Sequence, residues 1–499
     1  MLVFFLPVFL VFLMVGLPVF FALLFAPGIL LWLNGQERDI ALLYRNVYNG
    51  MDSFPLMALP FFMLAGELMN RGGITTRLVE FSQALMGHLR GGLAHVNILS
   101  SMLFAGLSGS AVADTSALGS TLIPAMEKNG YSRRFAAAVT AASSVIGPII
   151  PPSGIMIIYA YVMGESVAAL FLAGIVPGVL VGLGLMMVVR LLADRYDLPK
   201  AERIVTTNQT ISPLEDRISF LLLRINFAGV LLIVYTLAKS IVSAATGAEI
   251  AISNWVPFIV LLPLAHVVLL RMRKTVSADF RVICKKAVAP LQTPIIILGG
   301  ILIGVFTPTE ASAIAVAYAL LISFFVLKTL KLSDLPAILT KSALASSTVL
   351  LLVGAAVAFK TVVSLSHAPE QLAALILGLS DEPLILLFLI NILLFVVGMF
   401  LDAGPAIIIL GPILGPIFMD LGVHPVHFAI IMSVNLTVGL ATPPMGLVLF
   451  VASSVSGERV ETIARAILPF LAIEIFVIFL ITYVPAISLA IPKLTGFVH

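Results

Sequence analysis

Apolar residues dominate this 499-residue chain in long runs that short polar stretches separate. Many of the runs approach the roughly 20 residues that an α-helix needs to cross a bilayer. Transmembrane strands would instead give short segments of alternating polarity. The pattern therefore predicts an all-α polytopic membrane protein. The uninterrupted helices that we expect cover residues 2–14, 17–33, 55–70, 74–85, 168–189, 289–305, 309–327, 344–364 and 467–484, with two more inside 218–270 and an interfacial arm at 34–54.

Composition supports this class of protein. Hydrophobic residues make up 60% of the chain and charged residues only 11%, which is more apolar surface than a soluble core absorbs. The net charge of +3 lies in loops, so it bears on topology and does not indicate nucleic acid. The single cysteine excludes an intramolecular disulfide and a cysteine-rich metal site. Residues 2–14 lack a basic n-region and a small-residue cleavage site, so we expect them to stay as a span.

Two further apolar runs contain residues that break helices. The run 93–126 is interrupted at 108–110, and the run 135–162 is interrupted between residues 147 and 154 by glycine, proline and serine. Irregular backbone survives at membrane depth only where protein or a water-filled cavity satisfies the freed N–H and C=O groups. Two adjacent breaks therefore indicate a binding site.

The same design returns later in the chain. A shift of 292 residues lays 106–154 on 398–446 without a gap. Apolar coincidences carry little weight in so hydrophobic a chain, whereas helix-breaking residues at fixed offsets are harder to obtain by chance. Paired interrupted segments in two halves indicate the binding site of a transporter. Gly106, Gly119, Pro124, Gly130, Gly147, Pro151, Pro152 and Gly154 fall on Gly398, Gly411, Pro416, Gly422, Gly439, Pro443, Pro444 and Gly446.

Charges beside the broken runs set their direction. Both flanks of 93–126 are basic, and the positive-inside rule puts both ends in the cytoplasm, which predicts a re-entrant hairpin. The run 384–419 has only acidic flanks and is expected to enter from the opposite, periplasmic side. Equivalent elements of opposite orientation form an inverted repeat, and residues 427–452 are its second broken helix. The flanking residues are Arg90, Lys128, Arg133 and Arg134 for the first run, and Asp381, Glu382 and Asp420 for the second.

The first hairpin tip and the neighbouring break carry oxygen ligands of the kind that alkali cations need. Hydroxyls, a carboxylate and unwound carbonyls converge there, which predicts a first sodium site. Asp114 has three candidate roles, as a cation ligand, as a proton carrier or as a cap on the second arm. The alternative for the serines and glycines is close helix packing. The predicted site comprises Ser108, Gly109, Ser110, Asp114, Ser144 and Gly147.

The second copy offers an equivalent group of residues. Its predicted sodium site comprises Asp402, Gly404, Thr437, Gly439 and Thr442. Asn435 lies opposite Ser143 in the repeat, so both are expected to face a shared substrate cavity. The alternative for Asn435 is an interhelical hydrogen bond, which contributes about 0.6 kcal/mol in membranes. The predicted cavity is lined by Ser110, Ser143, Pro151, Asn435 and Pro443.

No catalytic constellation accompanies these breaks. The seven histidines show no metal-ligand spacing on one helix face, and the chain has no phosphate loop, Ser/His/Asp grouping or HExxH motif. We therefore expect no enzyme and no metal besides sodium. Thr307 and Glu310 are expected to cap a helix, and Glu67 and Lys360 are left outside the site because long side chains reach a nearby interface.

Four segments, SGSAVADTSALGSTLIPAM, AASSVIGPIIPPSGIMIIY, GGILIGVFTPTEASAIAVAYALL and HPVHFAIIMSVNLTVGLATPPMG, resemble one family closely. It is the large (DctM-type) membrane subunit of tripartite ATP-independent periplasmic (TRAP) transporters, and the likeness covers about 1–190 and 285–490. The resemblance implies sodium-coupled secondary import of an organic anion, such as a C4-dicarboxylate, sialic acid or a sugar acid. It also implies a multi-pass protein of the bacterial inner membrane.

The resemblance further implies two partners, a small four-helix membrane subunit (DctQ type) and a periplasmic substrate-binding protein (DctP type). The family's fold is similar to that of divalent-anion/sodium symporters, in which an elevator-type transport domain moves against a scaffold. Its sodium sites lie where hairpin tips meet broken helices. That places Ser108, Ser110 and Gly147 at one ion, and Asp402, Gly404, Thr437 and Gly439 at the other.

These inferences divide the chain into five parts. Residues around 200–284 exceed the usual connection between halves of this family, so the extra hairpin is expected to modify the contact with the small subunit or to serve a subclass. The parts are 1–92, scaffold helices and arm; 93–190, first transport half; 191–284, loop and two-helix insertion; 285–380, second scaffold half; and 381–499, second transport half.

Two alternatives stay open at this point. A stand-alone sodium/anion symporter of the related fold would need no binding protein. An intramembrane enzyme or a scaffold protein belongs to another class. The missing catalytic grouping disfavours the enzyme, and the repeated broken helices disfavour the scaffold.

Overall fold

The computed structural model describes residues 37–199, 211–246, 255–302, 304–365 and 382–498, with residue 378 and most of 8–35. Every regular element in these ranges is a helix, which confirms the predicted all-α class. Most of the predicted span 2–14 lies outside the described residues. Among the described residues, seven helices are long and apolar enough to cross a membrane, namely Val167–Leu192, Ala278–Leu302, Pro308–Val326, Leu332–Lys360, Pro383–Phe400, Ala403–Asp420 and Val460–Tyr483.

The first half of the chain is a succession of helices. The breaks within its two interrupted apolar runs lie at 109–110 and at 145–153. Its elements are α2 (Val19–Leu33), α3 (Glu37–Met51), η1 (Pro55–Met57), α4 (Ala58–Arg71), α5 (Ile74–Met86), α6 (Gly92–Ser108), α7 (Ala111–Lys128), α8 (Arg133–Ser144), α9 (Gly154–Met163) and α10 (Val167–Leu192).

An inserted pair of helices precedes the second half, which repeats both interruptions. The elements are α11 (Pro213–Thr246), α12 (Trp255–Thr275), α13 (Ala278–Leu302), α14 (Pro308–Leu321), η2 (Ile322–Val326), η3 (Leu332–Asp334), α15 (Leu335–Leu365), α17 (Pro383–Phe400), α18 (Ala403–Asp420), α19 (Pro425–Gly439), α20 (Leu447–Ser456), α21 (Val460–Tyr483) and α22 (Ala486–Leu494).

The internal repeat is visible in the helix bounds. The shift of 292 residues maps α7 onto α18 at both ends, and it maps α10 onto residues 459–484, which α21 occupies. It also carries each break in the first half onto a break in the second. Some helices differ from the expected spans: α13 starts at Ala278 and α15 at Leu335, both well before the spans expected there, and α22 follows the last expected helix.

Helices α6 and α7 form a hairpin whose two outer ends meet. The backbone N–H of Leu93, at the start of α6, donates to Tyr131 Oη just after α7, at 3.2 Å. Burial raises the pKa of Tyr131 to about 12, so the phenol stays neutral, although the hydrogen bonds from Leu93 and Ala94 act in the opposite direction. The turn at the tip uses Gly109, whose φ of +61° suits glycine. Chain direction is thus reversed within two residues.

The runs 93–126 and 384–419 each fold back at their tip, and their outer ends, called the bases here, lie near opposite ends of α21. Near its start, Arg459 and Glu461 line one cavity with Arg134, which follows the base of the first hairpin. Near its end, Tyr483 Oη donates to the carbonyl of Leu384 at the start of α17, at 3.1 Å. The ring of His427, which follows α18, lies 3.2 Å from the carbonyl of Thr482. A helix of 24 residues spans about 36 Å, so the two bases are separated by roughly the thickness of a bilayer core.

Each half packs into the other. Helix α7 lies along α20, and α18 lies along α9. A Cβ built on Gly119 would lie 3.4 Å from Val455 Cγ1, and one built on Gly411 would lie 3.5 Å from Met163 Sδ. The return arm of each broken run therefore contacts the second half-helix of the other repeat, which joins both interrupted pairs in one body.

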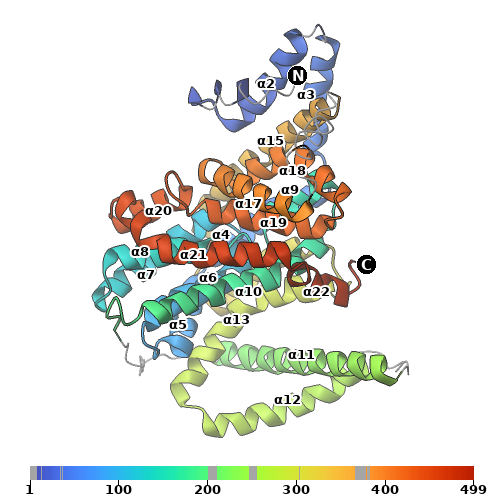
Figure 1. Ribbon diagram of the computed structural model, residues 1–499. Coiled ribbons are helices and arrows are strands. Elements are labelled where there is room, and N and C mark those ends of the chain that lie inside the picture. Colours follow the sequence, from blue (N-terminus) through green and yellow to red (C-terminus); the bar gives the residue numbers. More distant parts are fainter. Residues whose placement is uncertain are drawn as a thin grey trace.

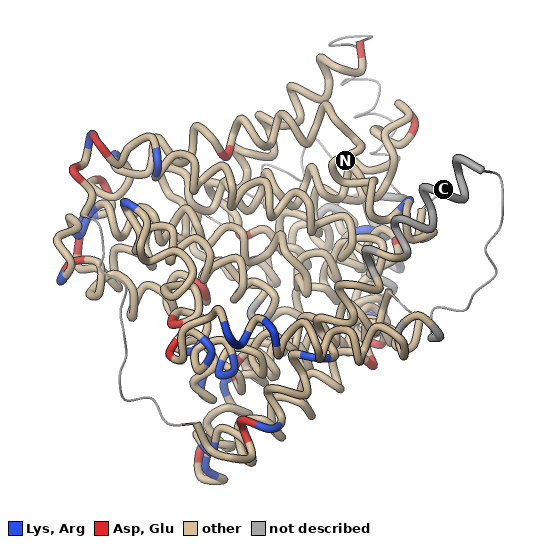
Figure 2. Tube along the Cα trace, turned by 90° about the horizontal axis from the view of Figure 1, so that it is seen from below, with Lys and Arg blue, Asp and Glu red and all other residues tan. Residues whose placement is uncertain are grey.

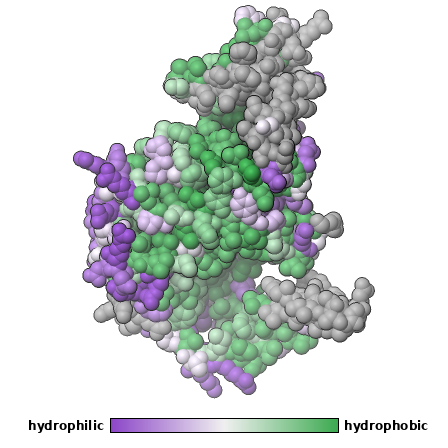
Figure 3. Space-filling model, in the orientation of Figure 1, coloured by the Kyte–Doolittle hydropathy of each residue, from purple (hydrophilic) through white to green (hydrophobic). Residues whose placement is uncertain are grey.

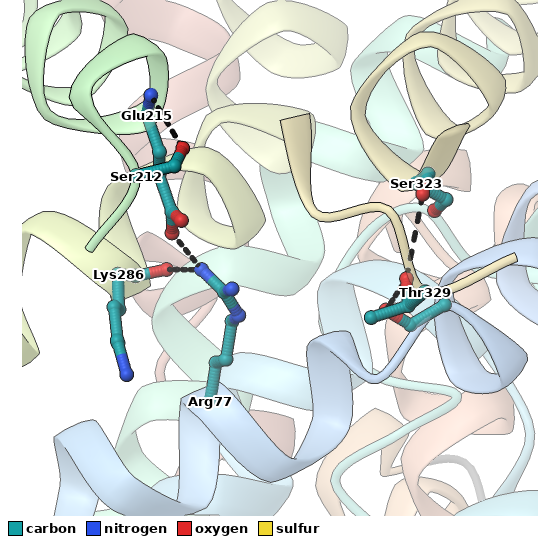
Figure 4. Close-up of polar contacts among 7 residues, drawn as sticks. Arg77, Ser212, Glu215, Lys286, Ser323 and Thr329 are labelled. Carbon is teal, nitrogen blue, oxygen red and sulfur yellow. Dashed lines mark hydrogen bonds and ion pairs between the residues drawn. The ribbon is translucent and has the colours of Figure 1, made fainter. Parts of the chain in front are cut away.

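The inserted helices α11 and α12 form a hairpin that stands beside this body (Figure 1). Arg77 of α5 pairs with Glu215 of α11, and both side chains are largely buried. Figure 4 shows the guanidinium reaching from α5 to this carboxylate and to the carbonyl of Lys286 on α13, at 3.3 Å. A second ion pair joins Lys285 to Asp216. Ion pairs therefore attach the start of α11 to α5 and to α13.

The surface suits a bilayer. Figure 3 shows a face that is mostly apolar, with polar residues gathered along its left edge. Figure 2 shows charged residues toward the ends of the molecule and few in the middle of the body. Exposed apolar residues of the long helices include Leu183, Met187 and Phe476. A soluble protein would not expose so continuous an apolar belt.

Candidate functional site

The first hairpin tip touches the first break. A Cβ built on Gly109 would lie 2.7 Å from the carbonyl oxygen of Pro152 and 3.5 Å from Ser153 Cα, so only glycine fits at this approach. Asp114, in the first turn of α7, is fully buried, and its carboxylate lies against the Cα of Gly147. The structure therefore brings Gly109, Asp114 and Gly147 together, from a tip and a break that the sequence placed side by side.

Local hydrogen bonds shape the first break. Ser144 is the last residue of α8, and its hydroxyl donates to the Thr140 carbonyl at 2.7 Å. The carbonyl of Ser144 accepts from Gly147 N at 3.1 Å. Ser153 caps α9 and donates to the Pro148 carbonyl at 2.5 Å. A serine hydroxyl that donates to a carbonyl keeps its lone pairs for another partner, so Ser144 presents an acceptor oxygen in this buried region.

The serines of the tip differ in what the structure describes. Ser110 caps α7, with its hydroxyl accepting from Ala113 N at 3.4 Å, and it is half-buried. Ser108 ends α6, and its side chain lies outside the described part of the chain. Hydroxyl, carboxylate and carbonyl oxygens make this an all-oxygen group of donors, which is the chemistry of hard cations.

The second group of predicted residues is spread over two contacts. Asp402 caps α18, its Oδ1 accepting from Ala403 N at 2.8 Å. Gly404 faces α9, where its Cβ would lie 3.6 Å from Ile158 Cδ1. Gly439, at the end of α19, instead packs against Gly398 of α17, where a Cβ would lie 2.6 Å from that Cα. The glycines thus mark close approaches of different helices.

The two threonines of this group donate hydrogen bonds to carbonyls of α19. Thr437 Oγ1 donates toward the carbonyls of Ser433 and Val434 at 2.8 and 3.0 Å. Thr442 Oγ1 donates to the Val438 carbonyl at 2.9 Å. Both residues are buried, and each oxygen keeps lone pairs that can face a cation.

Ser143 and Asn435 take the same place in the two repeats and bridge helices there. Ser143 Oγ donates to Asn97 Oδ1 of α6 at 3.2 Å and accepts from Ser101 Oγ at 2.9 Å. Asn435 Nδ2 donates to Asn391 Oδ1 of α17 at 2.6 Å. Asn435 is only 1% exposed. These contacts are interhelical hydrogen bonds, the alternative role expected for Asn435, and Asn435 Oδ1 itself has no hydrogen-bond partner among the described residues.

The prolines expected in the cavity also differ between the halves. Pro151 is buried, whereas Pro443 is partly exposed. Both Pro151–Pro152 and Pro443–Pro444 are joined by cis peptide bonds. The carbonyl of Pro151 lies 3.6 Å from the Cβ position of Gly106 on α6, so the first Pro-Pro pair packs against a hairpin arm.

Sequence reasoning missed Asn391 and Glu474 inside the body, and it left Lys360 outside the site. Asn391 accepts from both Asn435 and Thr482, whose Oγ1 lies 3.1 Å away, and so ties α17, α19 and α21 together. Lys360 of α15 donates to the carbonyl of Val162 at the end of α9, at 2.6 Å. Glu474 of α21 is fully buried, and neither carboxylate oxygen has a hydrogen-bond partner among the described residues. A polar residue alone in an apolar run was the available signal for each.

Chemistry other than cation binding has little support in this region. Within the described residues no three His, Cys, Asp or Glu side chains gather as a metal-binding group.

Glu165 lies in the short loop between α9 and α10, where burial raises the pKa of its carboxyl. The predicted capping box of α14 is present, with Thr307 N donating to Glu310 Oε2 at 2.8 Å.

A membrane protein of this kind, in which two halves repeat a hairpin and an interrupted helix, belongs to the class of secondary transporters. The family model of the tripartite ATP-independent periplasmic transporter, DctM component, matches residues 6–487. The chain therefore belongs to the DctM family and is a transporter subunit, not an enzyme. As a member of this family whose described part contains seven long apolar helices, it is a multi-pass protein of the bacterial inner membrane.

Several relatives match over nearly their whole length. YgiK of Salmonella typhimurium is 38% identical, over 97% of this chain and 96% of that one. The C4-dicarboxylate TRAP transporter large permease protein DctM of Pseudomonas aeruginosa is 34% identical, over 94% and 92%. The sialic acid TRAP transporter large permease protein SiaM of Vibrio cholerae is 35% identical, over 96% and 95%.

The fold is also similar to a solved one. The crystal structure of the Alcanivorax borkumensis YdaH transporter aligns with a TM-score of 0.50, at 16% identity, over 92% of this chain and 89% of that one. At this identity the likeness concerns the fold alone.

Proposed function

We propose that this chain is the permease through which a sodium gradient drives import of an organic anion. Relatives named for C4-dicarboxylate, for sialic acid and for 2,3-diketo-L-gulonate, a sugar acid, support carboxylate-bearing substrates. Moving one positive charge inward yields about 2.3 kcal/mol per 100 mV of membrane potential, before any concentration gradient is added. Because the anion carries charge of the opposite sign, the potential drives its import only when the cotransported sodium ions outnumber its negative charges, and the sodium concentration gradient supplies the rest.

One observation carries this proposal. A hairpin tip meets a broken helix, and a buried carboxylate, Asp114, lies against the backbone of Gly147. A charged group at membrane depth is retained where it has a function and a partner. The oxygen donors Ser110 and Ser144 lie on the same tip and break. Sodium would bind these groups, and Asp402, Gly404, Thr437, Gly439 and Thr442 would serve a second ion.

The bases of the broken runs at opposite ends of α21 support two oppositely inserted, re-entrant hairpins in an inverted repeat. The mutual packing of α7 with α20 and of α9 with α18 supports a transport domain that moves as one body. Its parts are 93–190 and 381–499, and the scaffold comprises 1–92 and 285–380. In this elevator mechanism, sodium orders the tips, the anion binds between them, and the domain carries both across the membrane.

Two partners complete the system. A DctQ-type four-helix subunit would contact the apolar outside of the scaffold, and a DctP-type binding protein would deliver the anion from the periplasm. The insertion at α11–α12 adds a further apolar surface beside α13, on which the small subunit or the lipid bilayer would lie.

The test is uptake by the reconstituted complex of large subunit, small subunit and binding protein in proteoliposomes. We expect uptake of a labelled C4-dicarboxylate or sialic acid with an inward sodium gradient and none when potassium replaces sodium. Asp114→Asn should abolish the sodium response, whereas Asp420→Asn, at the exposed end of α18, should preserve it. Uptake that is indifferent to sodium contradicts the proposal, and uptake by the large subunit alone would favour a stand-alone symporter.

A further inference from the structure

A cavity of about 860 Å³ lies beside the start of α21, away from both predicted sodium sites. Three separate segments line it, the start of α8, the chain after α10, and the loop and first turns of α21. Figure 1 places these ends together at the left of the molecule, where polar residues gather in Figure 3. The lining residues are Arg134, Tyr196, Arg459, Val460, Glu461, Thr462, Arg465 and Ala466.

The three arginines of this cavity have no ion-pair partner in the described part of the chain. Their neighbour Arg133 behaves differently, since its Nη2 lies 2.8 Å from Glu127 Oε2. Arg134, Arg459 and Arg465 are exposed to solvent and unpaired around the same hollow. Glu461 is the only acidic residue of the lining, so positive charge is in excess.

The rest of the lining also suits an anion. Helix α21 begins at Val460, so its free N–H groups and positive dipole end face this region. Thr462 adds a hydroxyl donor. The ring of Tyr196 packs on Phe135, with centroids 5.2 Å apart, which holds one wall in place. Guanidinium groups bind phosphate through paired N–H donors, a geometry that single point charges do not offer.

The cavity lies where the apolar surface of the protein ends. Leu468 of α21, three residues beyond Arg465, is 56% exposed, and Leu191 of α10, five residues before Tyr196, is 71% exposed. Exposed leucines mark the hydrocarbon boundary on both helices, so the arginines lie at the level of lipid headgroups. The positive-inside rule assigns this face to the cytoplasm.

We propose that this cavity is a binding site for a phosphate-bearing anion at the cytoplasmic face. The phosphate belongs either to an anionic phospholipid of the inner leaflet or to a soluble cytoplasmic phosphate compound. The guanidiniums of Arg134, Arg459 and Arg465 bind its oxygens, and Thr462 and the start of α21 donate further hydrogen bonds. Because α8 and α21 belong to the two repeats, occupancy fixes one half of the molecule against the other.

The test uses the full-length chain in phosphatidylcholine nanodiscs with two probes. The first is binding of labelled pyrophosphate, and the second is native mass spectrometry of phosphatidylglycerol retained from mixed-lipid discs. The cavity variant is R134Q/R459Q/R465Q. The control variant R271Q/R273Q/K274Q removes the same charge from exposed residues at the end of α12. Both readouts are independent of transport, so they do not depend on sodium-coupled uptake.

We expect at least one probe to bind the wild type and the control variant, and to bind the cavity variant about tenfold more weakly or worse. Loss of pyrophosphate alone identifies a soluble ligand, and loss of phosphatidylglycerol alone identifies a lipid. Binding of neither probe to the wild type, or equal binding to all three proteins, overturns the proposal, as does equal loss in both variants. If the triple variant does not fold, the three single Gln variants replace it, each expected to bind two- to fivefold more weakly, and three unchanged affinities overturn the proposal.

Discussion

The two halves of the chain share one frame of helices, yet they keep their carboxylates in different places. In the first half Ser110 caps the return arm and a buried aspartate, Asp114, follows four residues later. At the shifted positions the second half has Asp402 as the cap and Ala406 where the buried carboxylate would be. Asp402 is exposed, whereas Asp114 is fully buried. A repeated backbone therefore does not imply two identical sites.

The halves also differ in how their hairpin arms are joined to the broken helices. Hydroxyls dominate in the first half, where Ser143 contacts Asn97 and Ser101. The second half uses two amides, Asn435 and Asn391. Amide pairs hold a fixed separation and orientation, whereas hydroxyls rotate. The two halves therefore use different chemistry for the same helix contact.

The largest expected effect is the difference in sodium-dependent uptake between variants of Asp114 and of Asp402. Replacing Asp114 by Asn should reduce sodium-dependent uptake about 100-fold, because hydrogen bonds and ion contacts to a buried charge contribute about 1.5–3 kcal/mol. Asp402→Asn should reduce it about tenfold or less, since this side chain is exposed and water can replace its contacts. Uptake is measured against sodium concentration in proteoliposomes, and equal losses in the two variants would mean that the halves are equivalent.

The next prediction compares the glycines that allow close approach. A Cβ on Gly398 would lie 2.7 Å from the backbone oxygen of Leu436, whereas one on Gly106 meets Pro294 Cβ at 3.1 Å. Gly398→Ala should destabilise the protein by about 1–3 kcal/mol and Gly106→Ala by less, since forced overlap costs that much in packed interiors. Thermal unfolding in detergent measures both. Gly404→Ala, with an ordinary contact of 3.6 Å, is the control and should leave the unfolding temperature unchanged or raised.

The third prediction tests whether Asn435 and Ser143 form interhelical hydrogen bonds only or also contact the substrate. Asn435→Ala should lower the free energy of unfolding by about 1–2 kcal/mol, because it removes a buried bond to Asn391. Ser143→Ala should cost about 0.5–1 kcal/mol, because only a hydroxyl is lost. Uptake per folded molecule should stay within about threefold of the wild type in both. Abolished uptake by stable Asn435→Ala protein would instead support the predicted role of Asn435 in the substrate cavity.

The smallest expected effect is on the rate of uptake, and it concerns the C-terminal ends of α9 and α20. Helix α9 receives Lys360 of α15 at its last turn, whereas α20 is closed by its own loop, with Ser453 Oγ donating to the Glu458 carbonyl at 2.6 Å. If the domain containing α9 moves past α15, Lys360→Met should speed initial uptake two- to fivefold, corresponding to about 0.4–1 kcal/mol. Lys360→Arg keeps a donor and should stay near the wild-type rate. Slower uptake by the Met variant would contradict this role.

The positions of the helix breaks were predictable because glycine and proline interrupt a helix at the place where they occur in the sequence. Gly109 and Gly147 disrupt helices by their own backbone preferences, so the breaks, their repetition and the hairpin base near Arg90 follow from spacing and charge. The partners of buried polar groups were not predictable in this way. Asn435 bonds to a residue 44 positions away, and Lys360 to one 198 positions away. Such pairs depend on helix rotation and depth, which hydropathy does not encode.

The mutual packing of the two repeats has a consequence for synthesis in the cell. Gly119 on α7 is made long before its contact Val455 on α20, and at 5–20 residues per second the interval is about 20–70 s. During that time the flank of the first hairpin that α20 later covers is without its partner. The first half therefore reaches its final packing only after the second half has been made.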